Sequence, residues 1–215
     1  SGWLSAPLFS HSRGFHDTAF SLTLTNPNPD SDLYYSLDGT EPTLLYTDPL
    51  SINGSKVVRA TVRRANFQSP QTTTHTYVLR DSVMASNLMN TTYTQGALST
   101  RLRNSLTQLP TVCLSIPTLP DDYNERETSI EVFMPDGSPP LQINAGLNRV
   151  GGSWTNFAKK SYRVSFRAQY GQRNLDVPLF RGFDKGIPAK DDVDTLDLTA
   201  GNHDMLERGF YMANR

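Results

Sequence analysis

The chain has 215 residues, of which 37% are hydrophobic, and its 20 basic and 21 acidic residues leave a net charge of −1. Proteins that bind nucleic acid usually carry a basic excess or a basic face, so this balance argues against nucleic acid as a partner. No apolar run approaches the roughly 20 residues that a membrane-spanning helix needs, so no membrane span is predicted.

Residues 1–80 are predicted to form a small β-sandwich. Phe20, Leu22 and Leu24 alternate with polar residues, and this period of two predicts a half-buried strand over residues 19–25. Asp38-Gly39-Thr40 is a turn signal, because glycine tolerates positive φ. Further strands are predicted over residues 33–37, 56–64 and 74–79. Short strands separated by turn signals are typical of a sandwich.

Residues 81–108 are predicted to be a linker, because they are rich in Ser, Asn and Thr. Leu98, Leu102 and Leu106 recur at four-residue steps, which favours a short amphipathic helix over residues 97–106. Pro110 cannot continue such a helix. We therefore place a domain boundary in this stretch.

Residues 109–215 are predicted to form a second, α+β part, so the whole chain is mainly β. Tyr162, Val164 and Phe166 alternate with polar residues and predict a strand over residues 161–167. Other strands are predicted over residues 111–116, 128–134, 141–150 and 194–199. Residues 204–214 have a helical pattern that stops at Arg215 without a capping signal, so we expect a truncation inside a helix.

The first part resembles the chitobiase C-terminal-type β-sandwich, which is also called a fibronectin type III-associated domain. The resemblance is carried by four stretches in order, YYSLDGTEPT (34–43), YTDPLSI (46–52), VVRATV (57–62) and TYVL (76–79). It implies a module of the kind that accompanies extracellular carbohydrate-active and surface proteins.

The second part resembles the beginning of a spore-coat protein H (CotH) kinase-type domain, which has an atypical kinase fold. Five stretches carry this resemblance, namely LPTVCLSI (109–116), ERETSIEVFMPDG (125–137), the run from Asn144 to Gly171, LDVPLF (175–180) and DTLDLTAGNHD (194–204). Members of that family are often secreted, so the resemblance implies a secreted or cell-surface protein. It also implies ATP and magnesium as cofactors of the full-length protein.

A candidate nucleotide-binding region lies where two glycines, Gly151 and Gly152, precede two lysines, Lys159 and Lys160. Glycines let backbone amides approach phosphate oxygens, and a lysine supplies a point charge. In kinases this lysine pairs with a helical glutamate, for which Glu207 is the natural candidate. The alternative is a β-bulge followed by solvated lysines at the start of a strand.

Phosphoryl transfer also needs carboxylates that position the acceptor and hold magnesium. In the resembled family these acidic residues lie downstream of the region covered here. The sequence therefore predicts no catalytic residue, no metal site and no cofactor in this fragment. We expect an accessory or assembly region of a CotH-type surface or matrix protein that is not catalytic in isolation. The other enzymatic interpretation is the nucleotide-binding half of an active secreted protein kinase.

A binding function of another class is suggested by the aromatic residues. Exposed Trp and Tyr rings can stack on sugars while nearby polar groups bond the hydroxyls. The candidate ligand-binding residues are Trp154, Phe157, Tyr34 and Tyr35, and Trp3 belongs to the same aromatic set. A carbohydrate-binding module of a secreted protein is therefore the alternative function, with a polysaccharide in place of a surface protein as partner. Core packing is the structural alternative for each of these side chains.

The remaining reactive side chains give weaker signals. The four histidines lack the spacing of metal ligands, and surface or capping roles are expected for His11, His16, His75 and His203. The one cysteine, Cys113, is expected to be a small buried hydrophobic residue rather than a nucleophile.

Overall fold

The computed structural model describes residues 2–87, 89–151, 160–176 and 192–200, and the fold is mostly β, as predicted. Two compact units are present. The first consists of residues 1–117 and 129–143, and the second of residues 118–128 and 144–215. The predicted boundaries near residues 80 and 108 both fall inside the first unit.

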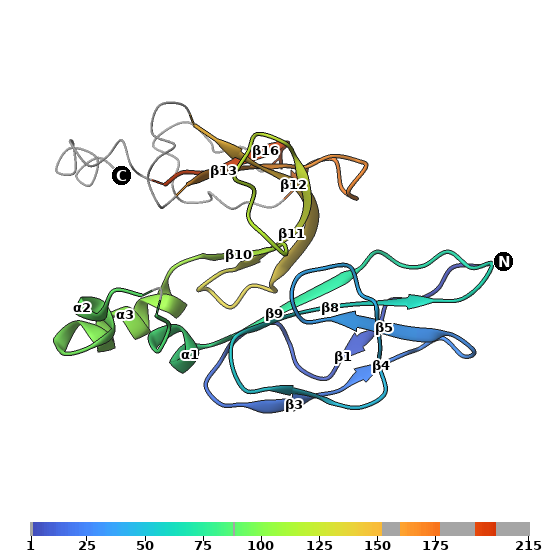
Figure 1. Ribbon diagram of the computed structural model, residues 1–215, viewed down its shortest axis with the longest axis horizontal. Helices are drawn as coiled ribbons and strands as arrows, with labels where there is room; N and C mark the ends of the chain where they lie inside the picture. The colour runs from blue at the N-terminus through green and yellow to red at the C-terminus, as the bar shows by residue number, and fades with distance from the viewer. Residues whose placement is uncertain (1, 88, 152–159, 177–191, 201–215) are drawn as a thin grey trace. The chain divides into compact units, whose positions relative to one another are not determined.

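The first unit contains a five-stranded sheet with the order β2-β9-β8-β5-β6, of which β9, β8 and β5 are labelled in Figure 1. These strands are β2 (Gly14–His16), β5 (Asp32–Ser36), β6 (Leu44–Leu45), β8 (Lys56–Arg63) and β9 (Thr73–Leu79). β8 pairs antiparallel with both β5 and β9, whereas β2 runs parallel to β9. β5, β8 and β9 confirm three of the predicted strands to within a residue or two at each end.

Four short strands form two further pairs, and they are β1 (Leu8–Phe9), β3 (Phe20–Leu22), β4 (Leu24–Thr25) and β7 (Leu50–Ile52). β1 pairs with β4, and β3 pairs with β7. Their side chains and those of the larger sheet share one core, which includes Leu22, Ile52, Val58, Val62 and Tyr77, all fully buried. This shared core is the sandwich that the alternating pattern predicts.

The single strand predicted over residues 19–25 is wrong, because two strands that belong to different pairs occupy this stretch. The change occurs at Thr23, whose N–H is bonded to the Ser10 hydroxyl at 2.9 Å and whose carbonyl accepts from the Ser10 N–H at 2.9 Å. Leu22 and Leu24 are both buried on either side of this point. Alternation therefore continues through a change of pairing partner that no local pattern reveals.

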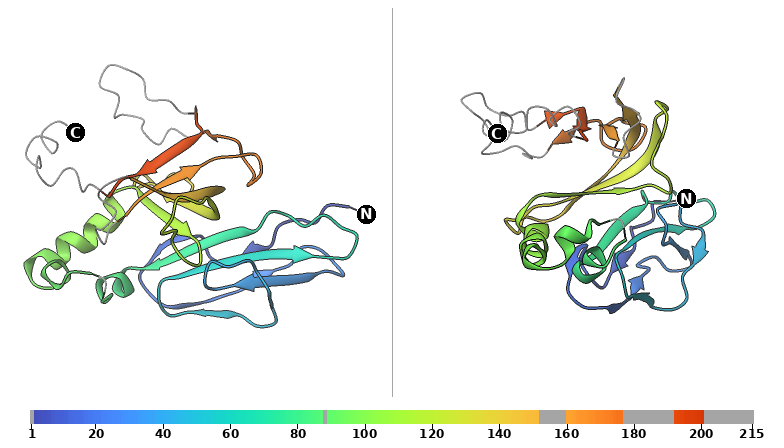
Figure 2. Two further views of the ribbon diagram at one scale, coloured as in Figure 1. Left: turned by 45° about the horizontal axis from the view of Figure 1, so that its top comes forward. Right: turned by 60° about the vertical axis from the view of Figure 1, so that its left-hand side comes forward.

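The segment predicted as a linker contains three helices, α1 (Arg80–Met84), α2 (Thr91–Thr94) and α3 (Ala97–Gln108). They lie together at one end of the large sheet (Figures 1 and 2). α3 confirms the predicted helix, and α2 begins with a side-chain cap, in which Asn90 Oδ1 accepts from the Thr92 N–H at 2.9 Å.

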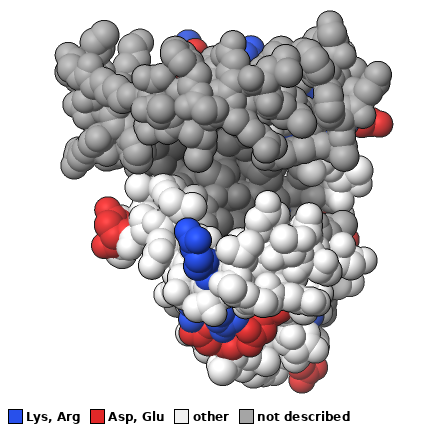
Figure 3. All heavy atoms as spheres, turned by 90° about the vertical axis from the view of Figure 1, so that its left-hand side faces the viewer, with Lys and Arg blue, Asp and Glu red and all other residues white. Residues whose placement is uncertain are grey.

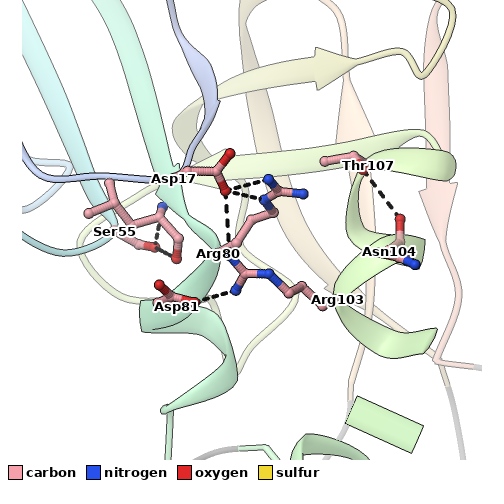
Figure 4. A network of polar contacts seen from close by, with 8 residues as sticks. Asp17, Ser55, Arg80, Asp81, Arg103, Asn104 and Thr107 are labelled. Atoms are coloured by element: carbon pink, nitrogen blue, oxygen red, sulfur yellow. Dashed lines mark hydrogen bonds and ion pairs between the residues drawn. The ribbon is translucent and has the colours of Figure 1, made fainter. Parts of the chain in front are cut away.

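Acidic and basic side chains join the helices to the sandwich (Figure 4). Asp17, which follows β2, accepts from Arg80 Nε at 2.7 Å and from Arg103 of α3 at 3.5 Å, and Arg103 also pairs with Asp81. The Arg80 hydrogen bond, aided by the nearby charges, lowers the pKa of Asp17. Most of the described atoms in Figure 3 are uncharged, and one group of basic side chains there lies against acidic ones.

A second five-stranded sheet has the order β10-β11-β12-β13-β16. Its strands are β10 (Thr111–Ser115), β11 (Arg126–Phe133), β12 (Leu141–Val150), β13 (Ser161–Ser165) and β16 (Thr195–Leu198). All five confirm predicted strands. The pairing of β10 with β11 belongs to the first unit, where Thr111 opposes Phe133 and Ser115 opposes Ser129.

The second unit also contains a small pair, β14 (Leu175–Asp176) and β15 (Asp192–Val193). The elements described after α3 are all strands, so the α+β character of the second part stays a prediction. The helix predicted over residues 204–214 lies outside the described residues. Within the described ranges, no helix has the length and apolar content that crossing a membrane requires.

Candidate functional site

The predicted glycine–lysine region lies at one end of the β12–β13 hairpin. Val150 and Ser161 are partners in the antiparallel register, so Gly151 follows one strand and Lys160 precedes the other at the same end. Gly151 is exposed and has φ of +110°, a conformation that L-residues rarely adopt. The structure thus brings together one predicted glycine and one predicted lysine. The other three predicted residues, Gly152, Lys159 and Glu207, lie outside the described residues.

Tyr123 and Arg149 hold the chain at this hairpin end. The Tyr123 hydroxyl donates to the Gly151 carbonyl at 2.9 Å, and the Arg149 guanidinium lies 5.6 Å from the centre of the Tyr123 ring. Arg149 also donates from its backbone N–H to the Asp122 carbonyl at 3.2 Å. Sequence reasoning missed both residues, because neither belongs to a local motif.

One carboxylate of the second unit is held by two donors. Glu125 accepts from Arg167 Nε at 3.1 Å and from the Tyr170 hydroxyl at 3.0 Å. Its side chain passes directly over Gly146, where an added Cβ would lie 2.4 Å from the Glu125 carboxyl carbon. The glycine therefore makes room for this carboxylate, and Glu125 is an acid that the sequence pattern did not single out.

The predicted ligand-binding tyrosines lie on opposite faces of β5, as expected for neighbouring residues in a strand. Tyr35 packs against the core and meets Tyr46 edge-on at 6.1 Å. Tyr34 lies beneath the Arg63 guanidinium, which is 5.0 Å from its ring centre. One flat ligand cannot stack on both rings. The other two predicted residues, Trp154 and Phe157, lie outside the described residues.

Trp3 is the most exposed large hydrophobic side chain that the structure describes, at 84% of its full accessibility. Its backbone forms an isolated bridge with Gln68. The ring is therefore held at the surface of the sandwich and is available to a partner.

The turn at Asp38-Gly39-Thr40 covers a buried arginine on β8. Asp38 accepts from the Thr40 N–H at 3.1 Å, and Gly39 has φ of +81°. Arg59 Nη1 donates to the Gly39 carbonyl at 3.0 Å and to the Thr40 carbonyl at 3.3 Å. Turn residues of the stretch YYSLDGTEPT (34–43) therefore supply carbonyl acceptors to the buried Arg59 guanidinium.

A second buried charge lies where β9 and β11 meet inside the first unit. The Glu131 side chain is fully buried, and it accepts from the Thr76 N–H at 3.1 Å and from the Thr76 hydroxyl. Arg13 Nη1 lies 3.4 Å from Glu131 Oε1, and 14% of the Arg13 side chain is exposed. Burial raises the pKa of Glu131, and Thr76 and Arg13 oppose this effect.

The same surroundings change the chemistry of two neighbouring groups. Burial, followed by the Glu131 charge, raises the pKa of the Cys113 thiol to about 12, so the half-buried cysteine is a poor nucleophile at neutral pH. Burial, followed by the Arg13 charge, lowers the pKa of His75 to about 3, so this imidazole stays neutral.

The three described histidines belong to an aromatic cluster rather than to the surface roles that we expected. His75 stacks on Phe9 with ring centres 3.9 Å apart, and His11 stacks on Phe20 at 4.2 Å. His16 also packs against Phe20, at 4.7 Å. In the part of the chain that the structure describes, no group of three His, Cys, Asp or Glu residues is placed to hold a metal ion. His203 lies outside that part.

Comparison with known proteins identifies the sandwich. Residues 22–77 match the model of the family described as Fn3 associated, which supports the predicted fibronectin-associated β-sandwich. Neither the curated proteins nor the solved structures contained a match to the chain. The family match does not reach residues 109–215, so the resemblance of this part stays a prediction.

Proposed function

We propose that this chain is the accessory and assembly region of an extracellular CotH-type surface or matrix protein, and that it does not transfer phosphate by itself. The Fn3-associated sandwich acts as its spacer or binding platform. ATP and magnesium are proposed as cofactors of the full-length protein, as the resemblance to the CotH family implies.

The buried contact between β9 and β11 carries this proposal. β9 is the last strand of the sandwich, and Thr76 on it gives both its N–H and its hydroxyl to Glu131 of β11. A buried charged hydrogen bond with these donors fixes position better than a flexible linker does. The sandwich is therefore bonded to β11 within the first unit, which suits a spacer or binding platform better than a freely tethered module would.

The hairpin end around Gly151 and Lys160 supports the CotH-type assignment. A glycine with positive φ beside a lysine is an arrangement that can receive phosphate oxygens. Receiving phosphate is only part of a kinase site, so we expect this chain to bind a nucleotide feebly at most and not to transfer phosphate.

Incubation of the full chain with labelled ATP, Mg²⁺ or Mn²⁺ and a generic protein acceptor tests the proposal. We expect no labelled acceptor and no labelled chain. Robust incorporation that disappears in Lys160→Ala would contradict the accessory role and favour the kinase interpretation. Incorporation that persists in Lys160→Ala would point to a contaminating kinase and would call for a repeat with repurified protein.

Carbohydrate binding is the second candidate, and the exposure of Trp3 favours it. Affinity electrophoresis in gels that contain insoluble or soluble polysaccharides tests this function. Retardation that is lost in Trp3→Ala but kept in Tyr93→Ala, a substitution at another exposed aromatic residue, would favour a sugar-binding module. Equal mobility in every gel would remove it.

A further inference from the structure

Arg59 has an unused hydrogen-bonding edge in the interior of the first unit. Its residue is 6% exposed, and its Nε and Nη2 atoms are buried without a hydrogen-bond partner in the described structure. Only Nη1 is used, for the carbonyls of Gly39 and Thr40. No carboxylate of the described residues lies within 4.0 Å of this guanidinium.

The buried Arg59 guanidinium carries a positive charge that no negative charge of the described residues balances. Arginine side chains are always charged in proteins. Carbonyl oxygens satisfy hydrogen bonds but carry no net charge, and buried charges in proteins are normally paired with an opposite charge. The site therefore favours an anion.

The unused edge has the geometry of an anion fork. Nε and Nη2 point the same way, and the same two atoms of other arginines in this chain grip carboxylates. Arg163 gives one bond to each oxygen of Asp197, both at 2.7 Å, whereas Arg80 directs both atoms to a single oxygen of Asp17. The fork therefore accepts either two oxygens or one single acceptor atom.

A neighbouring hydroxyl adds a further donor. Thr74 is fully buried, its Oγ1 has no partner in the described structure, and it lies directly opposite Arg59 in the β8–β9 register. Residues that oppose each other in an antiparallel pair project from the same face of the sheet. Two sets of unused donors thus occur on one buried face.

We propose that Arg59 binds a small monovalent anion, chloride in ordinary solution, through Nε and Nη2 beneath the Asp38–Thr40 turn. The low exposure of the arginine favours a monatomic ion over phosphate or a substrate carboxylate. The ion would neutralise the charge under the turn and stabilise the first unit, independently of the function proposed above.

Bromide provides the direct test on the unchanged full chain. In crystals soaked in sodium bromide, we expect an anomalous peak within hydrogen-bond distance of both Arg59 nitrogens. A water molecule at this position with no anomalous signal would overturn the proposal, and so would an edge closed by protein atoms.

Solution measurements give an independent readout. We expect the chlorine-35 NMR line to broaden on adding the protein, and this effect to be lost in Arg59→Met and kept in Arg63→Met, a substitution at an exposed arginine of the same strand. At about ten times the dissociation constant, chloride should raise the unfolding midpoint by about 3–5 °C. Equal broadening by both variants would overturn the proposal, and the bromide experiment decides if Arg59→Met does not fold.

Discussion

Replacing Arg13 by Met removes the positive charge beside Glu131 and leaves a fully buried carboxylate with Thr76 as its remaining partner among the described residues. At 3.4 Å and an effective dielectric constant of about 20, the attraction between the two charges is about 5 kcal/mol. Removing one member of a buried pair costs about 3–5 kcal/mol in free energy of unfolding. The two hydrogen bonds from Thr76 remain, so we expect a loss of about 3 kcal/mol.

Urea unfolding monitored by circular dichroism gives the total loss in free energy of unfolding. Hydrogen exchange of the β9 and β11 amides shows where in the structure the loss occurs. The double variant Arg13→Met/Glu131→Met should recover most of the stability, because it removes both buried charges. Arg126→Met, which breaks the exposed pair with Asp122, should leave stability nearly unchanged. A change below about 1 kcal/mol in Arg13→Met, or no recovery in the double variant, would refute this reasoning.

The same variant has an expected pH dependence. Because burial raises the pKa of Glu131 in the folded state, protonation of this group favours folding, and its contribution to stability grows as the pH falls through that raised pKa. Neutral Glu131 no longer needs a cation. The difference between wild type and Arg13→Met should therefore shrink on acidification.

Three further outcomes are expected. His75 has a pKa of about 3 in the folded protein and about 6.5 when unfolded, so the wild-type free energy of unfolding should fall by up to about 5 kcal/mol between pH 6.5 and 3 through this group. In a plot of urea midpoint against pH, the decline on the acid side should be less steep for His75→Gln than for wild type. Identical declines would contradict the burial of a neutral imidazole. Gly39→Ala should cost about 2 kcal/mol in unfolding free energy, because the residue has positive φ and its Cβ would lie 3.1 Å from the Ile116 backbone; an unchanged urea midpoint would show that the turn can relax. Cys113, whose thiol pKa is raised to about 12, should react with iodoacetamide at pH 8 only after unfolding, and fast labelling of folded protein would contradict this.

The predictable parts of the fold were those encoded over a few neighbouring residues. The β-branched residues of KVVRATVRR and the turn signal at Asp38-Gly39-Thr40 predicted β8 and the turn after β5. β1 and β6 have only two residues each and show no period. Such strands form because a neighbouring strand supplies their hydrogen bonds, and the local sequence does not indicate which strand that is.

The charged sites could not be predicted for a similar reason. Glu131 lies in a segment correctly predicted as a strand, but its partner Thr76 is 55 residues away. A carboxylate in an alternating strand normally faces solvent. Arg59 likewise stands among valines, and only the folded turn at Gly39 and Thr40 provides its acceptors. Sequence reasoning could predict that Gly151 and Lys160 lie near one another, because they stand at the same end of the β12–β13 hairpin.

The two compact units are interleaved along the backbone, which passes from one to the other after Pro117, after Thr128 and after Ile143. A protease that nicks any one of these connections leaves the units covalently joined through the other two. Exchange of the second unit by recombination would likewise need several coordinated crossovers instead of one. The two units are thus expected to be inherited, produced and degraded together, unlike domains that are joined by a single linker.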